Sequence, residues 1–170
     1  MLSREQILDL LRALDVELRA ASAKGEICLY GGTVMCLVYH SRPATRDVDA
    51  VFEPTRAIRE ACSKIAAERG LPEDWLNDAV KGFLVDHARS TYLELENLRV
   101  LVPEPDYLLA MKALAARFDT SDRDDVVFLI EKLALKSATE VFDILERYYH
   151  PDQIRPATRF FIEEIFDPAT

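Results

Sequence analysis

The sequence lacks the features that mark membrane and secreted proteins. No apolar run approaches the roughly 18–20 residues that a membrane-spanning helix needs. The first residues, MLSREQILDLL, contain no basic segment followed by a continuous apolar core, so they do not predict a signal peptide. We therefore expect no membrane association and a cytoplasmic location.

Cysteine and histidine are scarce, and neither shows the spacing of a metal site. The three cysteines are odd in number and form no CxxC, so we expect small buried side chains and no disulfide framework. The three histidines form no HExxH or HxH pattern, which favours ordinary surface or half-buried positions. The residues concerned are Cys28, Cys36, Cys62, His40, His87 and His150.

An excess of positive charge is also missing. The chain has 21 lysines and arginines against 30 acidic residues, which gives a net charge of −9. Broad, sequence-independent binding to DNA or RNA depends on neutralising phosphates, so this balance argues against it. A local basic patch, a bound cation and a basic partner all remain compatible with the charge.

The 170 residues suffice for a small domain with a core and a helical appendage. Hydrophobic periodicity and capping signals predict helices at both ends and short strands between them, which is an α+β fold with a small mixed sheet. We expect an α/β core over 1–102 and a helical bundle over 103–170. The expected helices are 4–23, 33–38, 56–69, 106–117, 125–136, 137–148 and 154–166, and the expected strands are 27–30, 47–52, 83–86, 92–95 and 99–102.

The stretch YGGTVMCLVYHSRPATRDVDAVF, residues 30–52, holds the most informative pattern. Asp47 and Asp49 (the aspartate pair) are spaced to share one face of a strand, about 6.5 Å apart. Two carboxylates so placed repel each other unless a cation lies between them. Oxygen ligands suit Mg²⁺ or Mn²⁺, so the pair predicts a metal platform for phosphoryl or nucleotidyl transfer.

Gly31 and Gly32 (the glycine pair) precede a short apolar segment that begins at Thr33. Without a Cβ, glycines let backbone amides approach a phosphate, and a helix beginning at Thr33 would add its own amides and hydroxyl. Taken alone, the glycine pair is compatible with a simple tight turn, and the aspartate pair with a solvated strand end. Their occurrence together within about 20 residues is what favours a site.

This arrangement resembles the nucleotidyltransferase superfamily of the polymerase β fold, whose signature is a glycine pair followed by an Asp-x-Asp strand. The surrounding RPATRDVD, with Arg42 and Thr45, is similar to the AbiEii-like branch of minimal nucleotidyltransferases, many of which are toxins of toxin–antitoxin pairs. The resemblance implies that the aspartate pair binds Mg²⁺ (or Mn²⁺) and that the glycine pair with Thr33 holds the β- and γ-phosphates. Arg42 or Arg46 would hold nucleotide or acceptor.

A second match comes from YLLAMKALAARFDTSDRDDVVFLIEKL, which is similar to a later signature of the same branch. It corresponds to Lys112, Arg117, Asp122 and Asp125, and it implies that Lys112 neutralises the triphosphate while the two aspartates shape the site beside it. From the residues alone, a lysine in an apolar helix must reach solvent or meet an anion. Aspartates at the start of a helix are also compatible with simple capping.

The superfamily often has a third metal-binding carboxylate on a later strand, and no motif identifies it here. Glu94 and Glu96 in TYLELEN are spaced to share a face and are the candidates, with Asp86 as a further acid in the region. The resemblance then implies transfer of a nucleotidyl group from an NTP to a hydroxyl of tRNA, another RNA or a protein, with a cognate antitoxin as partner. The alternatives are a catalytically weak nucleotidyltransferase-like binding module and a purely structural domain.

Overall fold

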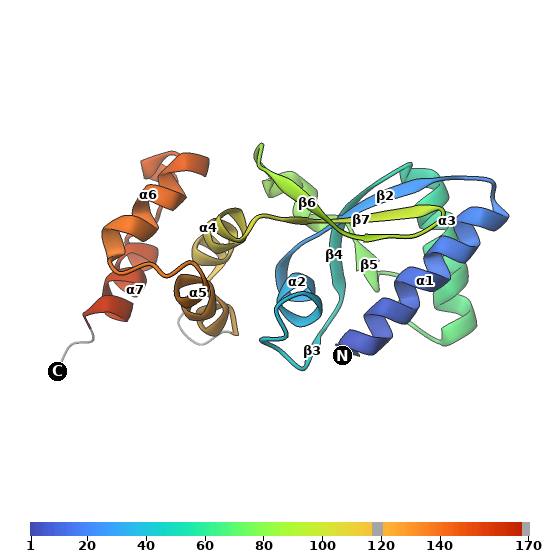
Figure 1. The fold of residues 1–170 in the computed structure, drawn as a ribbon, viewed down its shortest axis with the longest axis horizontal. Helices are drawn as coiled ribbons and strands as arrows, with labels where there is room; N and C mark the ends of the chain where they lie inside the picture. Colours follow the sequence, from blue (N-terminus) through green and yellow to red (C-terminus); the bar gives the residue numbers. More distant parts are fainter. Residues whose placement is uncertain (117–120, 168–170) are drawn as a thin grey trace. The chain divides into compact units, whose positions relative to one another are not determined.

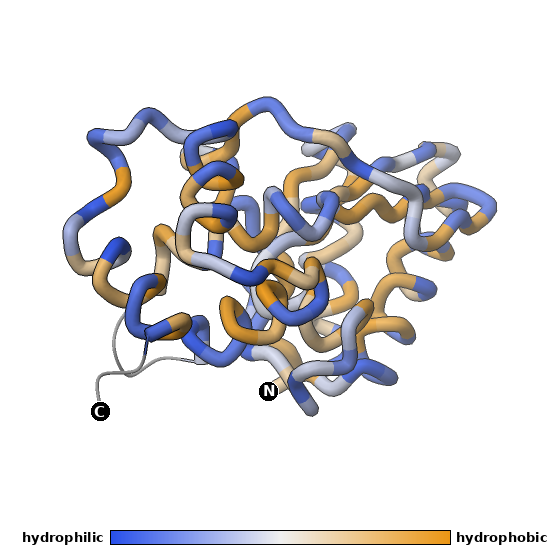
Figure 2. The backbone as a smooth tube through the Cα atoms, turned by 60° about the vertical axis from the view of Figure 1, so that its left-hand side comes forward, coloured by the Kyte–Doolittle hydropathy of each residue, from blue (hydrophilic) through white to orange (hydrophobic). Residues whose placement is uncertain are grey.

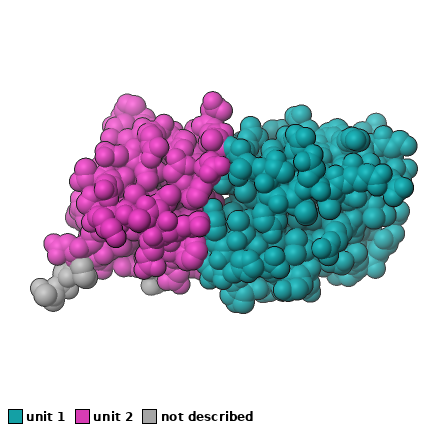
Figure 3. All heavy atoms as spheres, in the orientation of Figure 1, with its two compact units in different colours: residues 1–84, 89–103 teal, residues 85–88, 104–170 magenta. Residues whose placement is uncertain are grey.

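A computed structural model describes residues 1–116 and 121–167 of the chain. Arg117, which the resemblance implicates, lies outside these described residues. The chain divides into two compact units (Figure 3): unit 1 comprises 1–84 and 89–103, and unit 2 comprises 85–88 and 104–170. The main boundary therefore lies between Pro103 and Glu104, and the short segment 85–88 belongs to unit 2 although both its flanks belong to unit 1.

Unit 1 contains a five-stranded sheet in the order β5-β4-β2-β7-β6 and a separate two-stranded ribbon of β1 and β3 (Figure 1). Strand β2 pairs antiparallel with β4 and parallel with β7, so the sheet is mixed, as the sequence predicted. Its elements are β1 (Leu2–Ser3), α1 (Arg4–Ala20), β2 (Gly25–Leu29), α2 (Gly31–Leu37), β3 (Ala44–Thr45), β4 (Val48–Glu53), α3 (Thr55–Arg69), β5 (Leu76–Asn77), the 3-10 helix η1 (Ala79–Phe83), β6 (Arg89–Glu94) and β7 (Leu98–Pro103).

Helices α1 and α3 cover one face of this sheet (Figure 1). A Cβ at Gly25 would lie 2.9 Å from Leu18 Cδ1 of α1 and 3.1 Å from Ile58 Cδ1 of α3, which identifies the face that these helices contact. Hydrophobic and hydrophilic residues alternate along the helices (Figure 2), as expected for helices with one buried side. The buried residues of this face include Leu11, Leu14, Leu18, Ile27, Leu29, Val48, Ala50, Phe52, Ile58 and Val100.

The side chains of β4 alternate between this covered face and the opposite one. Val48, Ala50 and Phe52 are buried, whereas Asp49 is half-buried. The alternation explains how an acidic residue is accommodated in an apolar strand, because Asp49 lies on the face that α1 and α3 do not contact. Asp47 immediately precedes the strand and is also half-buried.

The two ends of the sheet differ in chemistry. At one end β2 stops at Leu29 beside Ala50, next to the glycine and aspartate pairs, and we refer to it as the aspartate end. At the other end Glu26 pairs with Glu53 and with Arg99, and we refer to it as the glutamate end.

Unit 2 is helical, and its α4 (Pro105–Ala115) contributes Tyr107 to a buried aromatic group. The His87 ring, from the segment 85–88, stacks on Tyr107 with centroids 3.8 Å apart, and Tyr148 contacts Tyr107 edge-on at 5.0 Å. The Val85 amide donates to the Tyr107 hydroxyl at 3.2 Å, so this segment is bound by both stacking and a hydrogen bond. The remaining elements are α5 (Ser121–Lys132), α6 (Ala138–Tyr148), the 3-10 helix η2 (Pro151–Gln153) and α7 (Pro156–Phe166).

The predicted α+β class is confirmed, with seven α-helices within the described residues. The predicted strand over 83–86 is wrong, since η1 extends to Phe83 and 85–88 belongs to unit 2. Helix α5 begins at Ser121, earlier than predicted, and so includes its acidic residues. Within the described ranges, no helix has the length and apolar character required to span a bilayer.

Candidate functional site

The glycine pair and the aspartate pair lie together at the aspartate end. The Tyr30 amide donates to the Asp49 carbonyl at 2.8 Å, which brings the chain after β2 beside the start of β4. Gly31 has φ +61°, and a Cβ there would lie 2.8 Å from Asp49 Oδ2. Only glycine fits this position without strain, because both the backbone angle and the neighbouring carboxylate exclude a side chain.

Gly32 and Thr33 fix the loop that precedes the aspartates. A Cβ on Gly32 would lie 2.8 Å from Thr45 Oγ1 and 3.1 Å from Arg42 Nη1. The segment that carries Arg42 and Thr45 therefore lies directly against the first turn of α2. The Thr33 hydroxyl is buried and donates to the Asp47 carbonyl at 3.1 Å. This structural role differs from the phosphate contact that the resemblance implies for Thr33.

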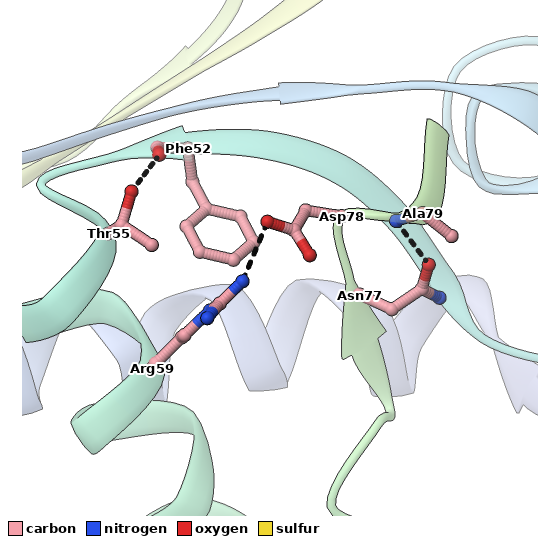
Figure 4. A network of polar contacts seen from close by, with 6 residues as sticks. All are labelled: Phe52, Thr55, Arg59, Asn77, Asp78 and Ala79. Carbon is pink, nitrogen blue, oxygen red and sulfur yellow. Dashed lines mark hydrogen bonds and ion pairs between the residues drawn. The ribbon is translucent and has the colours of Figure 1, made fainter. Parts of the chain in front are cut away.

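Asn77 of β5 joins the aspartate pair, and the sequence did not predict it. Its Cα is paired with that of Asp49 in the parallel β4–β5 register, and its Nδ2 lies 3.4 Å from Asp47 Oδ2. Its Oδ1 accepts from the Ala79 amide at 3.1 Å (Figure 4). The asparagine between acids in DWLND is a signal that could have drawn attention to this position, but residues 73–82 show no periodicity that would place it on a strand.

The short strand β5 is attached to α3 next to this position. Arg59 Nη2 and Asp78 Oδ2 are 2.8 Å apart, and the Thr55 hydroxyl donates to the Phe52 carbonyl at 3.4 Å (Figure 4). Arg59 is exposed, so this ion pair contributes little to stability, on the order of 1 kcal/mol or less. Its effect is local, because it attaches the residue after Asn77 to a helix of the core.

Three arginines lie around the aspartate end. Arg42 is half-buried beside Gly32, and Arg46 is exposed next to Asp47. Arg89, which the sequence analysis missed, extends from edge strand β6 to the Cys28 thiol of β2. Burial raises the pKa of Cys28, while hydrogen bonds with Tyr30 and Arg89 lower it. Cys28 shares the face of Asp49, so Arg89 supplies a positive charge on that face.

Glu94 and Glu96 do not join the aspartate pair, so the structure brings neither candidate for a third metal ligand to it. Glu94 pairs with Arg99, which lies level with Glu26 and Glu53 at the glutamate end. Glu53 is four residues from Asp49, or about 13 Å along the strand. Both glutamates are exposed; Glu94 contacts Arg99 at 3.3 Å and Glu96 contacts Arg19 at 3.5 Å. They line a groove of about 490 Å³ at the glutamate end.

Lys112, Asp122 and Asp125 form a second cluster, within unit 2. Lys112 Nζ lies 2.5 Å from Asp122 Oδ1 and 2.9 Å from Asp125 Oδ2. The exposed fractions of the Lys112 and Asp125 side chains are 7% and 2%, and that of Asp122 is 27%. Of the two alternatives for a lysine in an apolar helix, solvent or an anion, Lys112 therefore meets an anion. That anion is a pair of aspartates from α5.

The donor set at the aspartate end fits one divalent cation that also binds a phosphorylated substrate. Mg²⁺ commonly takes one or two carboxylates and completes its shell with phosphates and water. Asp47 and Asp49 supply the carboxylates, and the glycine pair adjoins them. Among the described residues, no group of three or more histidine, cysteine, aspartate or glutamate side chains is placed to hold a metal.

Comparison with known proteins gives no relative: no family model, no curated protein and no solved structure matches the chain.

Proposed function

We propose that the chain is a metal-dependent nucleotidyltransferase that moves a nucleotidyl group from an NTP to a hydroxyl of an RNA or protein acceptor. One observation supports this most strongly: Gly31 contacts the carboxylate of Asp49 so closely that a Cβ would lie 2.8 Å from Oδ2. A phosphate accepted by the glycine loop would therefore lie beside the carboxylates that hold its counter-ion. Neither pair alone would favour this chemistry over a turn or a solvated strand end.

In this proposal Asp47 and Asp49 hold Mg²⁺ or Mn²⁺, which when bound neutralises phosphate charge. The backbone amides of Gly31, Gly32 and Thr33 hold the β- and γ-phosphates, and Arg42 or Arg46 holds nucleotide or acceptor. The acceptor oxygen forms a bond to the α-phosphorus, the bond to the bridging oxygen breaks, pyrophosphate leaves and the hydroxyl proton passes to water. The chain contributes positioning and charge neutralisation. The role of Lys112 at the triphosphate stays a prediction.

The acceptor and the biological setting follow from the resemblance together with the charge. AbiEii-like enzymes include many toxins of toxin–antitoxin pairs, so we place the chain in that setting, with tRNA or a protein as acceptor and a cognate antitoxin as partner. The net charge of −9 disfavours binding along a nucleic acid backbone. An RNA acceptor would accordingly be bound through a short segment near the arginines of the aspartate end.

A second candidate is a nucleotidyltransferase-like module that binds a nucleotide but transfers it weakly or not at all. The specific observation in its favour is the position of Glu94 and Glu96 at the glutamate end, so that Asp47 and Asp49 are, among the described residues, the two carboxylates assigned to the aspartate end. A site with two carboxylates still suits the nucleotide-bound cation. The two candidates therefore agree on binding and differ in turnover.

Binding is tested by calorimetry of the full chain with ATP, GTP, CTP and UTP, each with and without Mg²⁺. We expect at least one NTP to bind with Mg²⁺, and Asp47→Ala plus Asp49→Ala to abolish the magnesium-dependent part. The matched control is Glu94→Ala plus Glu96→Ala, which removes the same two charges from the glutamate end. If no NTP binds, or if both double variants lose binding equally, the assignment of the site is wrong.

A further inference from the structure

The side chain beside the aspartate pair on the adjacent strand is an amide. Asn77 is the Cα partner of Asp49 on the adjacent parallel strand, so both side chains lie on the same face of the sheet. Asp47 also lies on this face, and its Oδ2 is 3.4 Å from Asn77 Nδ2. Two carboxylates and one amide, from Asp47, Asp49 and Asn77, therefore share this face of the sheet.

The orientation of the Asn77 amide is set by a neighbour. The Ala79 amide donates to Asn77 Oδ1 at 3.1 Å (Figure 4). The NH₂ group of Asn77 is the side that contacts Asp47 Oδ2. An asparagine donates from its nitrogen and accepts through its oxygen, so the backbone contact decides which side faces the carboxylate. Asn77 thus donates to the Asp47 side chain and adds no negative charge to the pair.

We propose that Asn77 is a positioning residue that replaces a third carboxylate, holding Asp47 in place so that the aspartate pair takes a single divalent cation. The inference rests on the proposed function, since it concerns the same metal site. Partners that orient metal ligands through hydrogen bonds commonly change metal affinity by about 10–100-fold when they are removed. A neutral amide also leaves the site with less negative charge than three carboxylates would have, which limits it to one cation.

Two substitutions at Asn77 shift the metal affinity in opposite directions. Asn77→Ala removes the donor to Asp47, and we expect Mn²⁺ binding to weaken roughly tenfold. Asn77→Asp places a third carboxylate beside the pair, and we expect Mn²⁺ to bind at least about tenfold more tightly, because hard cations gain affinity with ligand charge. Without metal, Asn77→Asp brings three like charges together, so its melting temperature should fall and then recover when Mn²⁺ is added.

The measurement is a titration of the full chain with Mn²⁺ alone, with free Mn²⁺ followed by electron paramagnetic resonance. The charge-matched control is Ser63→Asp, on the exposed side of α3, which adds one negative charge away from the site. The affinity for Mn²⁺ should be highest in Asn77→Asp, intermediate in the wild type and lowest in Asn77→Ala. Ser63→Asp should bind Mn²⁺ as tightly as the wild type. A merely structural asparagine would weaken binding in both variants, so equal losses in the two would overturn the proposal.

The remaining outcomes separate this inference from the proposed function. If Asp47→Ala abolishes Mn²⁺ binding but Asn77→Asp binds no more tightly than Ser63→Asp, the role of Asn77 is wrong and the metal site stands. If Mn²⁺ binds neither wild type nor Asn77→Asp, both proposals are wrong. Should Asn77→Ala fail to fold, as judged by the fluorescence of Trp75, the Asn77→Asp arm still decides the question.

Discussion

Replacing Gly31 with alanine tests whether the glycine pair and the aspartate pair form one structural unit. The substitution imposes two separate costs. The backbone at Gly31 has φ +61°, which an alanine tolerates at about 1–2 kcal/mol. The new Cβ would also lie 2.8 Å from Asp49 Oδ2, and such overpacking typically costs about 1–3 kcal/mol. We expect Gly31→Ala to lower the free energy of unfolding of unit 1 by the sum of the two costs, about 2–5 kcal/mol.

Two other glycines of the same unit separate these costs. Gly70 has φ +64° but nothing within 4 Å of a Cβ, so Gly70→Ala should show the backbone cost alone, about 1–2 kcal/mol. Gly82 has open space as well and no positive φ, so Gly82→Ala should be neutral or stabilising by up to about 1 kcal/mol. Of the three variants, Gly82→Ala should therefore be the most stable, Gly70→Ala should be intermediate and Gly31→Ala should be the least stable.

The assay is denaturant unfolding followed by the fluorescence of Trp75, the single tryptophan, which is buried in unit 1 and therefore reports on that unit. In the double variant with Asp49→Ala the carboxylate is gone, so the extra cost of Gly31→Ala should shrink to that of Gly70→Ala. If Gly31→Ala costs no more than Gly70→Ala, or if Asp49→Ala does not relieve it, the close contact between the two pairs is refuted.

Three further predictions concern single groups. Lys112→Met removes the ammonium group that contacts the nearly fully buried Asp125, so hydrogen exchange should show unit 2 destabilised by about 3–5 kcal/mol at neutral pH. Exchange as slow as in the wild type would contradict this. Burial and the hydrogen bond to Asp106 raise the pKa of Tyr148 from 10.0 to about 12, so stability should fall as the pH rises through this range, and Asp106→Asn should shift the absorbance titration of Tyr148 to lower pH; an unmoved titration would exclude the Asp106 contribution. Arg89→Gln should weaken magnesium-dependent NTP binding by about tenfold, because a hydrogen bond to a charged group contributes about 1.5 kcal/mol; unchanged calorimetry would exclude Arg89 from the site.

Local signals in the sequence predicted most helices well. Ser3 with Gln6 forms the capping box that the spacing indicated, and the Ser137 side chain accepts from the Glu140 amide at the start of α6. Such signals depend on contacts within four residues, so they can be recognised without knowledge of the fold. The pattern from Gly31 to Asp49 was recognisable for a related reason, since the chain returns on itself over a short distance.

Contacts that depend on strand register could not be predicted in the same way. The alternation of side chains along a strand correctly indicates which residues share a face of the sheet. It does not indicate which end of the sheet those residues occupy. Glu94 was therefore a reasonable candidate until the register with Arg99 placed it at the glutamate end. Asn77 was missed for the converse reason, because β5 has only two residues and shows no periodicity.

The segment 85–88 shows the same limitation at the level of units. The β-branched and aromatic content of 83–86 predicted a strand that overlaps this segment, whereas Val85 and His87 contact Tyr107 of unit 2. A segment of four residues contains too few positions for a period to be distinguished. Its assignment depends entirely on a partner twenty residues further along the chain.

The most direct test of nucleotidyl transfer compares NTPs labelled at the α-phosphate with NTPs labelled at the γ-phosphate, each incubated with the chain, Mg²⁺ and either total tRNA or lysate protein. We predict that only the α-label becomes attached to RNA or protein, and that Asp49→Asn abolishes the attachment while Glu94→Gln leaves it intact. Attachment of the γ-label, or of an α-label that persists in Asp49→Asn, would contradict the proposed reaction. No attachment at all, with magnesium-dependent NTP binding retained, would replace it with the binding module.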